Sequence, residues 1–264
     1  MRLNVIEAGQ GAPLVLLHGL FGSARNWGAV QKALAPQYRV LALDLRNHGA
    51  SAHAAGMAYA AQAEDIAETL AALDIRSATI LGHSMGGKAA MMLALTRPDL
   101  VERLIIADIA PRPYPPALRA VVAAMQAVPL HAGLTRAEAD QALRSAVPEA
   151  SIRSFLLQNL RFETAPPGWR MGLTEIAAAM PEIEAFAPPQ DARFDGPVLA
   201  MAGALSPYIR AEDHAAFRAL FPSIAFASIP RAGHWLHAEN PEGFLATLRE
   251  FLAVGRSGDG GEFA

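Results

Sequence analysis

The sequence predicts an α/β fold: a doubly wound, mostly parallel sheet with helices on both faces and a helical cap insertion. Short apolar runs of strand length recur along the chain, with helical patterns between most of them. Several runs are continuously hydrophobic rather than alternating, as expected for parallel strands covered on both faces. Between residues 111 and 186 the alternation stops, and helical patterns continue without a strand-like run. We interpret this segment as an insertion into the α/β fold.

Length and composition are those of one globular unit with an inserted segment. Of 264 residues, 52% are hydrophobic and 18% charged, so a sizeable core is available. The net charge of −3 and the lack of a Lys/Arg-rich run argue against nucleic acid as a partner. With no cysteine, a disulfide framework, a thiolate zinc site and a cysteine nucleophile are all excluded. No run is long enough to span a membrane and none resembles a signal peptide, so we expect a cytoplasmic protein.

The elements follow in order along the chain. The predicted strands cover residues 3–8, 14–17, 40–43, 78–81, 104–107, 198–201 and 224–229. Helices are predicted at residues 59–73 and 87–95, and Asn240 with Pro241 supplies an N-cap and a first-turn proline for the last helix. We therefore expect residues 1–110 and 187–254 to form the core, and residues 255–264 to form a flexible tail.

Residues 111–186 are expected to form a helical cap. Thr135 and Glu138 have the spacing of a capping box, which starts a helix. In open α/β sheets, ligands bind outside the carboxyl ends of the strands, where this insertion departs. The insertion is therefore either a mobile cap over a pocket or a set of helices packed on the flank of the sheet. The residues that we predict to contact substrate are Phe21, Phe155 and Trp169.

The sequence Gly-His-Ser-Met-Gly at residues 82–86 carries the clearest chemical signal. Although this pattern alone is weak, it lies here between a predicted strand and a predicted helix. That context is typical of a nucleophile elbow, a tight turn that lifts the serine hydroxyl above the sheet. Glycine is needed at Gly82 and Gly86 because a Cβ there would crowd the neighbouring strand and helix. We therefore predict that Ser84 is a nucleophile, aided by the positive end of the helix that follows it.

A serine hydroxyl is a poor nucleophile unless a base removes its proton during attack. Among eight histidines, His234 follows the last predicted strand, where its loop can overhang Ser84. It also follows the nucleophile in the chain, which is the order that this fold requires. His18 and His48 each precede a glycine in a tight loop, so we expect them to organise those loops. No catalytic role is expected for the others, His53, His83, His131, His214 and His237.

Acyl transfer also needs hydrogen-bond donors aimed at the developing oxyanion. The loop at residues 18–22, His-Gly-Leu-Phe-Gly, directly follows the strand predicted at 14–17. It can offer the backbone N–H of Leu20, with that of Phe21 as the alternative. The second expected donor is the N–H of Met85, the residue after the nucleophile.

Together these motifs resemble the α/β-hydrolase superfamily and, more narrowly, the bacterial YbfF-type and mitochondrial ABHD-type esterases. The resemblance extends from about residue 3 to residue 254. It rests on the His-Gly loop, Arg-Asn-His-Gly at 46–49, Gly-His-Ser-Met-Gly-Gly-Lys at 82–88 and Gly-His at 233–234. It implies hydrolysis of a small carboxylic ester with a short to medium acyl chain through an acyl-enzyme, without metal or cofactor.

The triad acid departs from the commonest pattern of the superfamily. Many members carry it after the penultimate strand, in a Gly-x-x-Asp sequence, but here that position is Ser206, which cannot do this work. The resembling esterases draw their acid from the strand before the insertion, which implies Asp108. Asp108 would then hold His234 in the productive tautomer.

Three other carboxylates compete with Asp108. Asp195 precedes the strand at 198–201 and is expected at the opposite end of the sheet from the nucleophile. Glu212 and Asp213 are expected within a helix that begins near Pro207, so their side chains would have to bend back to reach the base. We therefore favour Asp108.

The same serine triad also supports other reactions. Acyl-thioesterases, cofactor-free haloperoxidases and C–C bond hydrolases share it, so the sequence separates them poorly. A non-catalytic binding protein of this fold would usually lose a triad member, whereas both Ser84 and His234 are present. An aspartate nucleophile is excluded by Ser84 itself. Oligomeric state is left open.

Overall fold

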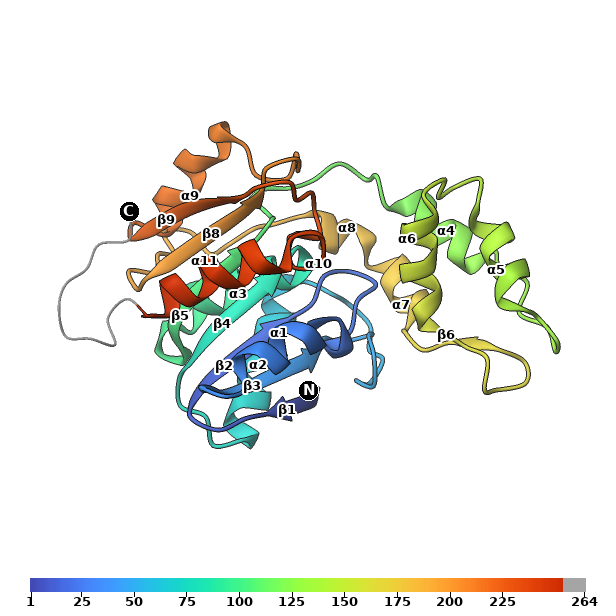
Figure 1. The fold of residues 1–264 in the computed structure, drawn as a ribbon, viewed down its shortest axis with the longest axis horizontal. Coiled ribbons are helices and arrows are strands. Elements are labelled where there is room, and N and C mark those ends of the chain that lie inside the picture. The colour runs from blue at the N-terminus through green and yellow to red at the C-terminus, as the bar shows by residue number, and fades with distance from the viewer. Residues whose placement is uncertain (254–264) are drawn as a thin grey trace.

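The computed structural model describes residues 1–253, and a seven-stranded sheet lies at its centre (Figure 1). The strand order is β1-β3-β2-β4-β5-β8-β9. All neighbouring strands are parallel except β1 and β3. The strands are β1 (Asn4–Ala8), β2 (Ala12–Leu17), β3 (Tyr38–Asp44), β4 (Ala78–His83), β5 (Val101–Ala107), β8 (Val198–Gly203) and β9 (Ile224–Ile229). The predicted mostly parallel sheet is confirmed. The expected tail at 255–264 lies outside the described residues.

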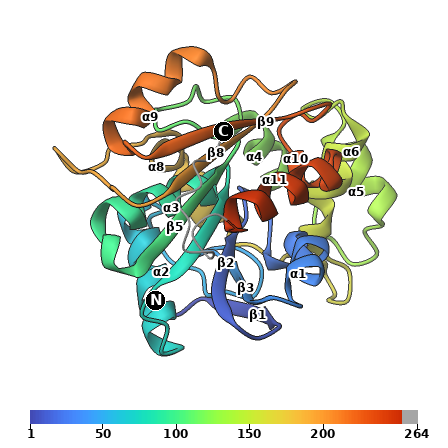
Figure 2. The same ribbon diagram turned by 60° about the vertical axis from the view of Figure 1, so that its left-hand side comes forward.

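Helices cover both faces of the sheet. They are α1 (Gly28–Leu34), α2 (Tyr59–Ala72), α3 (Met85–Thr96), α9 (His214–Leu220), α10 (Leu236–Glu239) and α11 (Pro241–Ala253). Short 3₁₀ turns occur at Ala24–Trp27, Pro98–Leu100, Leu157–Asn159 and Ala211–Asp213. Figure 2 shows α2 and α3 on one side of the sheet and α1 and α11 on the other.

The side chains of β2 show why two helix layers are needed. Leu14 and Leu16 pack in the core beneath α1 and α11, whereas Val15 and Leu17 pack in the core beneath α2 and α3. All four are fully buried. Successive strand residues point to opposite faces, so a continuous apolar run requires cover on both.

The helix-start signals in the sequence are largely accurate. The Asn240 side chain accepts from the Gly243 amide at 3.0 Å, so it caps α11 as predicted. Thr135 and Glu138 form the predicted capping box at the start of α5 (Arg136–Leu143). The prediction that a helix begins near Pro207 is wrong. A 3₁₀ turn starts at Ala211, and α9 starts at His214.

The insertion continues from the end of β5 and lies to one side of the sheet (Figure 1). Its helices are α4 (Arg119–Gln126), α5, α6 (Ala150–Leu156), α7 (Leu173–Ala178) and α8 (Met180–Glu184). It also contains a two-stranded ribbon, β6 (Leu160–Arg161) with β7 (Gly168–Trp169). The expectation of no strand here was wrong, because two-residue strands are too short to give a periodic pattern. No helix within residues 1–253 is long and apolar enough to cross a membrane.

Candidate active site

Ser84 occupies the tight turn between β4 and α3. Its backbone is in a positive-φ conformation, φ 52° and ψ −119°, which is strained for a residue with a side chain. The Ser84 amide donates to the Ala107 carbonyl at 3.0 Å, which fixes the turn against β5. A Cβ on Gly82 would lie 2.1 Å from the Gly86 carbonyl, and one on Gly86 would lie 2.6 Å from that of Leu17. Both glycines are therefore required by the close approach of strand and helix.

His234 links Ser84 to Asp108. It lies in the loop between β9 and α10, and its Nε2 is 3.1 Å from the Ser84 Oγ. Its Nδ1 is 2.7 Å from the Asp108 Oδ2. An Nδ1–H that donates to Asp108 leaves Nε2 as the acceptor for the serine hydroxyl. The structure thus brings together the three residues singled out in the sequence.

The Asp108 carboxylate is fully buried at the end of β5. Its Oδ1 accepts from the Gly203 amide at 3.0 Å, and its Oδ2 accepts from the Ser206 hydroxyl as well as from His234. Ser206, which occupies the Gly-x-x-Asp position considered in the sequence, therefore donates a hydrogen bond to Asp108. Three donors fix the carboxylate in the orientation that holds the His234 ring.

The competing carboxylates have other partners. Asp213 is buried and pairs with Arg112 at 2.7 Å. Asp195 and Glu212 form exposed ion pairs with neighbouring arginines. Within residues 1–253, none of the three is hydrogen-bonded to His234.

The backbone amides of the two expected oxyanion donors, Leu20 and Met85, belong to residues that border the cavity at Ser84. In the part of the chain that the structure describes, no hydrogen bond uses the N–H of Leu20 or Met85. The alternative donor, the N–H of Phe21, is already engaged because it donates to the His48 Nε2 at 3.2 Å. This geometry favours Leu20 over Phe21.

His18 and His48 organise loops, as predicted. The Nδ1 of His18 is 2.8 Å from the Gly19 carbonyl, and its Nε2 accepts from the Leu45 amide at 3.0 Å. His48 is held in the same way. Its Nδ1 is 2.8 Å from the Arg46 carbonyl, and its Nε2 accepts from the Phe21 amide. Burial lowers the pKa of both rings, that of His48 to about 3, so both are neutral near pH 7.

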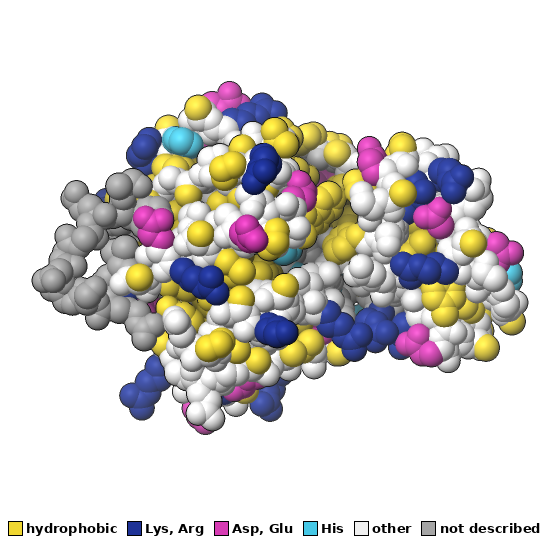
Figure 3. Space-filling view, viewed as in Figure 1, with side chains coloured by type: hydrophobic (Ala, Val, Ile, Leu, Met, Phe, Trp, Pro, Cys, Tyr) yellow, Lys and Arg dark blue, Asp and Glu magenta, His cyan; other side chains and the backbone are white. Residues whose placement is uncertain are grey.

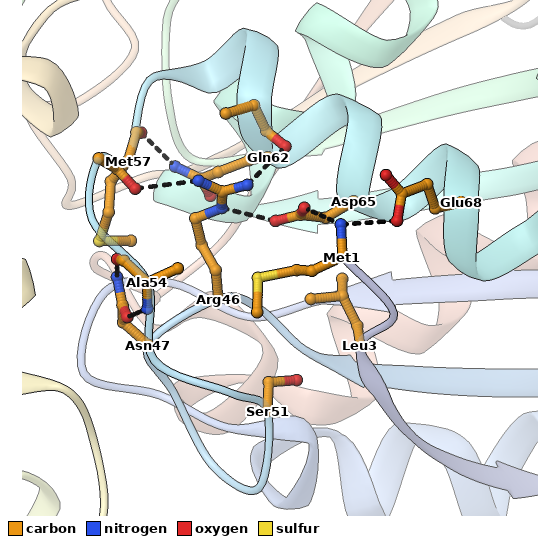
Figure 4. Close-up of polar contacts among 12 residues, drawn as sticks. Met1, Leu3, Arg46, Asn47, Ser51, Ala54, Met57, Gln62, Asp65 and Glu68 are labelled. Atoms are coloured by element: carbon orange, nitrogen blue, oxygen red, sulfur yellow. Dashed lines mark hydrogen bonds and ion pairs between the residues drawn. The ribbon is translucent and has the colours of Figure 1, made fainter.

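Arg46 and Asn47 of the Arg-Asn-His-Gly motif are fixed by polar contacts with neighbouring segments (Figure 4). The Arg46 guanidinium pairs with the buried Asp65 at 2.5 Å and donates to the Gly56 carbonyl at 3.0 Å. The Asn47 side chain forms two hydrogen bonds with the backbone of Ala54. These contacts support the loop of His48, which in turn holds the segment that carries Leu20.

Two rings that no sequence pattern identifies support His234. The His83 Nε2 is 2.8 Å from the His234 carbonyl, so an Nε2–H can donate to the loop that carries the base. The Tyr208 ring stacks on the His234 ring, with centroids 3.9 Å apart. The Tyr208 carbonyl accepts from the Tyr114 hydroxyl at 2.5 Å, which joins this loop to the start of the insertion. Such contacts depend on tertiary structure and leave no local pattern.

Two cavities meet at Ser84, where the surface is hollowed between the insertion and the rest of the molecule (Figure 3). The apolar cavity has a volume of about 330 Å³. Much of its wall is hydrophobic, with Phe21, Val121, Ile152, Phe155, Leu156 and Trp235. The lysine cavity, named for Lys88, has a volume of about 260 Å³. It is also bordered by Met85, Ile109, Arg112, Tyr114 and Arg210.

Of the three residues expected to contact substrate, Phe21 and Phe155 line the apolar cavity, but Trp169 does not. Trp169 is in β7, opposite Leu160, and lines neither of these two cavities. Its ring packs instead against the hydrophobic core. The expectation for Trp169 rested on its apolar side chain and its place in the insertion, which do not distinguish a cavity wall from a packed support. Within residues 1–253, no group of three or more His, Asp or Glu side chains is arranged to hold a metal ion.

Comparisons with known proteins find similar chains and a matching family model. A family model described as the alpha/beta hydrolase fold matches residues 12–241. The sn-1-specific diacylglycerol lipase ABHD11 of Mus musculus is 39% identical, over 96% of this chain and 85% of the relative. The esterase YbfF of Escherichia coli K12 is 35% identical, over 91% of this chain and 93% of the relative. A solved structure of a marine microorganism esterase superposes with a TM-score of 0.91 at 35% identity, covering 95% of this chain and 99% of that one.

Proposed function

The chain belongs to the α/β-hydrolase family, and from this premise we propose that it hydrolyses carboxylic esters of short to medium acyl chains at Ser84. The observation that carries the proposal is the hydrogen-bonded series from Ser84 through His234 to Asp108. Two relatives, one named a diacylglycerol lipase and one an esterase, support an ester as the substrate.

Each residue of the series has one role in the proposed reaction. His234 Nε2 takes the hydroxyl proton as Ser84 Oγ attacks the ester carbonyl carbon. The amides of Leu20 and Met85 stabilise the resulting oxyanion, a contribution of roughly 3 kcal/mol per donor in comparable sites. Asp108 stabilises the imidazolium. Collapse of the tetrahedral species expels the alcohol, which takes the proton back from His234.

The second half of the reaction uses the same groups. Water attacks the acyl-Ser84 ester while His234 removes its proton. The tetrahedral species collapses to release the carboxylic acid, and Ser84 regains its proton from the imidazolium. No group beyond the triad and the two amides is needed for proton balance.

We also infer that residues 111–186 act as a cap that selects the acyl chain. The wall of the apolar cavity includes Val121 of α4 and Phe155 of α6, both from the insertion. The opposite wall includes Phe21 from the core. A cavity shared between core and insertion excludes water from the acyl group and limits its length.

A fluorophosphonate probe tests the nucleophile. We expect it to add once to the protein, on the peptide that contains Ser84, and to abolish hydrolysis of p-nitrophenyl butyrate in proportion to labelling. An adduct on another serine, or full labelling without loss of activity, would contradict the proposed role of Ser84.

A further inference from the structure

The two cavities at Ser84 differ in charge. Both are lined by Ser84, Leu20, Leu118 and Tyr208. The wall of the lysine cavity adds Lys88, Arg112 and Arg210, whereas the wall of the apolar cavity includes neither Lys nor Arg. A substrate bound across Ser84 therefore meets Lys and Arg side chains on one side and none on the other.

The arginines of this wall already have carboxylate partners. Arg112 pairs with Asp213 at 2.7 Å, and Arg210 pairs with Glu212 at 3.3 Å. The acidic residue of the wall, Glu184, is bound by the exposed Arg119. Their charges are therefore largely balanced within the protein.

Lys88 has no such partner. Its ammonium donates to the carbonyls of Glu184 and Ala185, at 3.2 and 2.9 Å, and lies 4.9 Å from the centroid of the Tyr114 ring. No carboxylate within residues 1–253 forms an ion pair with it. The side chain is only 2% exposed, and an ammonium buried without a counter-ion is costly.

The choice of lysine at this position is itself informative. The chain contains only two lysines, Lys32 and Lys88, and its other basic side chains apart from histidine are arginines. An ammonium has three donors, and two of those of Lys88 are used by carbonyl groups. Burial and the nearby Arg112 lower the pKa of Lys88 to about 7, against the opposing effect of Glu184, so its positive charge is only partly compensated within the protein. An anion in the cavity would compensate it.

We propose that the lysine cavity binds an anionic group of the substrate, a carboxylate or phosphate, with the Lys88 ammonium as its counter-charge. This inference rests on the proposed ester hydrolysis, because it places the anion on the half of the ester that does not occupy the apolar cavity. Lys88 lies four residues after Ser84 on α3, one helical turn along, so both border the same space.

Matched pairs of esters test the proposal. On the alcohol side, the butyrate ester of glycolic acid is compared with that of glycolamide. On the acyl side, the mono-p-nitrophenyl ester of adipic acid is compared with that of adipamic acid. Each pair differs by one charge at nearly constant shape. Because the apolar cavity is proposed to take the acyl chain, we expect kcat/KM to favour the anionic member of the alcohol-side pair by roughly tenfold or more, as for a charge-assisted hydrogen bond.

Variants assign that preference to Lys88. Lys88→Met is expected to bring the anionic-to-neutral ratio close to one, whereas the matched control Lys32→Met, at an exposed lysine, keeps the wild-type ratio. A wild-type ratio near one in the alcohol-side pair would overturn the proposal. So would a Lys88→Met enzyme in which both members of the favoured pair fall equally, since that result assigns Lys88 a structural role.

A binding measurement separates this inference from the proposed function. In Ser84→Ala protein labelled with ¹³C only in lysine, two Cε resonances are expected, and Lys32 serves as the internal reference. The glycolate ester should raise the titration midpoint of Lys88 and leave that of Lys32 unchanged. If all four esters resist hydrolysis, the proposed function fails while this titration still decides the inference. A Lys88 midpoint unmoved by the glycolate ester up to its solubility limit would overturn it.

Discussion

Asp108 has a backbone φ of 54°, which is unusual for a residue with a side chain. This conformation turns the chain sharply at the end of β5, and the Asp108 amide donates to the Met201 carbonyl at 2.8 Å. The carboxylate is thereby held beside β8, within reach of both Ser206 and His234. Strain at one residue thus serves the geometry of the site.

Replacement of Asp108 tests this role at the residue scale. Asparagine keeps the shape but presents an N–H₂ group where an acceptor is needed, which favours the wrong tautomer of His234. We expect Asp108→Asn to lower kcat by roughly 10² to 10⁴, as in the serine-protease triad. The matched control Asp213→Asn removes a carboxylate from the ion pair with Arg112 and should remain within a few-fold of wild type. The opposite ranking, measured at one pH on folded proteins, would move the acid to Asp213.

At this scale, local patterns predict some residues and miss others. Ser84 and His234 could be found because the elbow and the loop after the last strand have sequence signatures. Asp108 required the resemblance to related esterases, since a lone strand-end aspartate has no signature. Tyr208 and His83 support the base through ring stacking and a backbone carbonyl, and neither contact leaves a trace in spacing.

At the scale of elements, the insertion contributes one wall of the apolar cavity through α4 and α6. Its path back to the core is fixed by α8, because the Tyr59 hydroxyl of α2 donates to the Ile183 carbonyl at 2.6 Å. The Asn159 side chain also donates to the Phe21 carbonyl at 2.7 Å, which connects the insertion to the His-Gly loop. The insertion is thus attached at both edges of the site.

Two aromatic residues of the insertion provide a matched test. Phe155→Ala enlarges the apolar cavity, so kcat/KM should shift from acetyl towards octanoyl esters by roughly tenfold, about the value of one to two buried methylene groups. Trp169→Ala changes an aromatic side chain that lines neither cavity and should leave this ratio unchanged. If Trp169→Ala shifts the ratio and Phe155→Ala does not, the assignment of the acyl site is wrong.

For these elements, the sequence identifies helix starts better than cavity walls. The capping box at Thr135 and the cap at Asn240 are local hydrogen-bond patterns, and both are confirmed. Whether Phe155 or Trp169 faces the cavity depends on how helices pack, which periodicity within one element cannot determine.

At the scale of the whole molecule, the parallel sheet places the carboxyl ends of β4 and β5 side by side. The pairing of His83 with Ala107 aligns these ends, so Ser84 and Asp108 follow at the same edge. The loop after β9 reaches the same edge with His234. The seven strands were predictable because each is a hydrophobic run between turn-forming residues.

The buried histidines predict how stability depends on pH. Burial lowers the pKa of His18, His48, His83 and His237, to about 3 for His48 and about 4 for His237. In the unfolded chain these rings titrate near 6.5, so below that pH the unfolded state binds protons that the folded state does not. The contribution of these neutral rings to the free energy of unfolding should therefore be complete above about pH 6.5. On acidification below that pH, the free energy of unfolding should fall by roughly 1.4 kcal/mol per pH unit for each ring.

Urea unfolding at pH 7.5 and pH 5 measures this effect above the range in which most carboxylates titrate. We expect the urea concentration at the midpoint of unfolding to be lower at pH 5 than at pH 7.5. The control His131→Asn changes an exposed histidine and should leave the difference between the two pH values unchanged. A midpoint that does not change between pH 7.5 and pH 5 would show that the four rings are not held neutral in the folded protein.

Turnover of p-nitrophenyl butyrate by Ser84→Ala tests the central claim most directly. The substitution removes the nucleophilic oxygen and leaves the elbow backbone in place. We expect the variant to fold with an unchanged circular-dichroism spectrum and thermal midpoint close to wild type, and to lose roughly 10³ to 10⁶ in kcat. Wild-type turnover by a folded Ser84→Ala protein would contradict the assignment of Ser84 as the nucleophile.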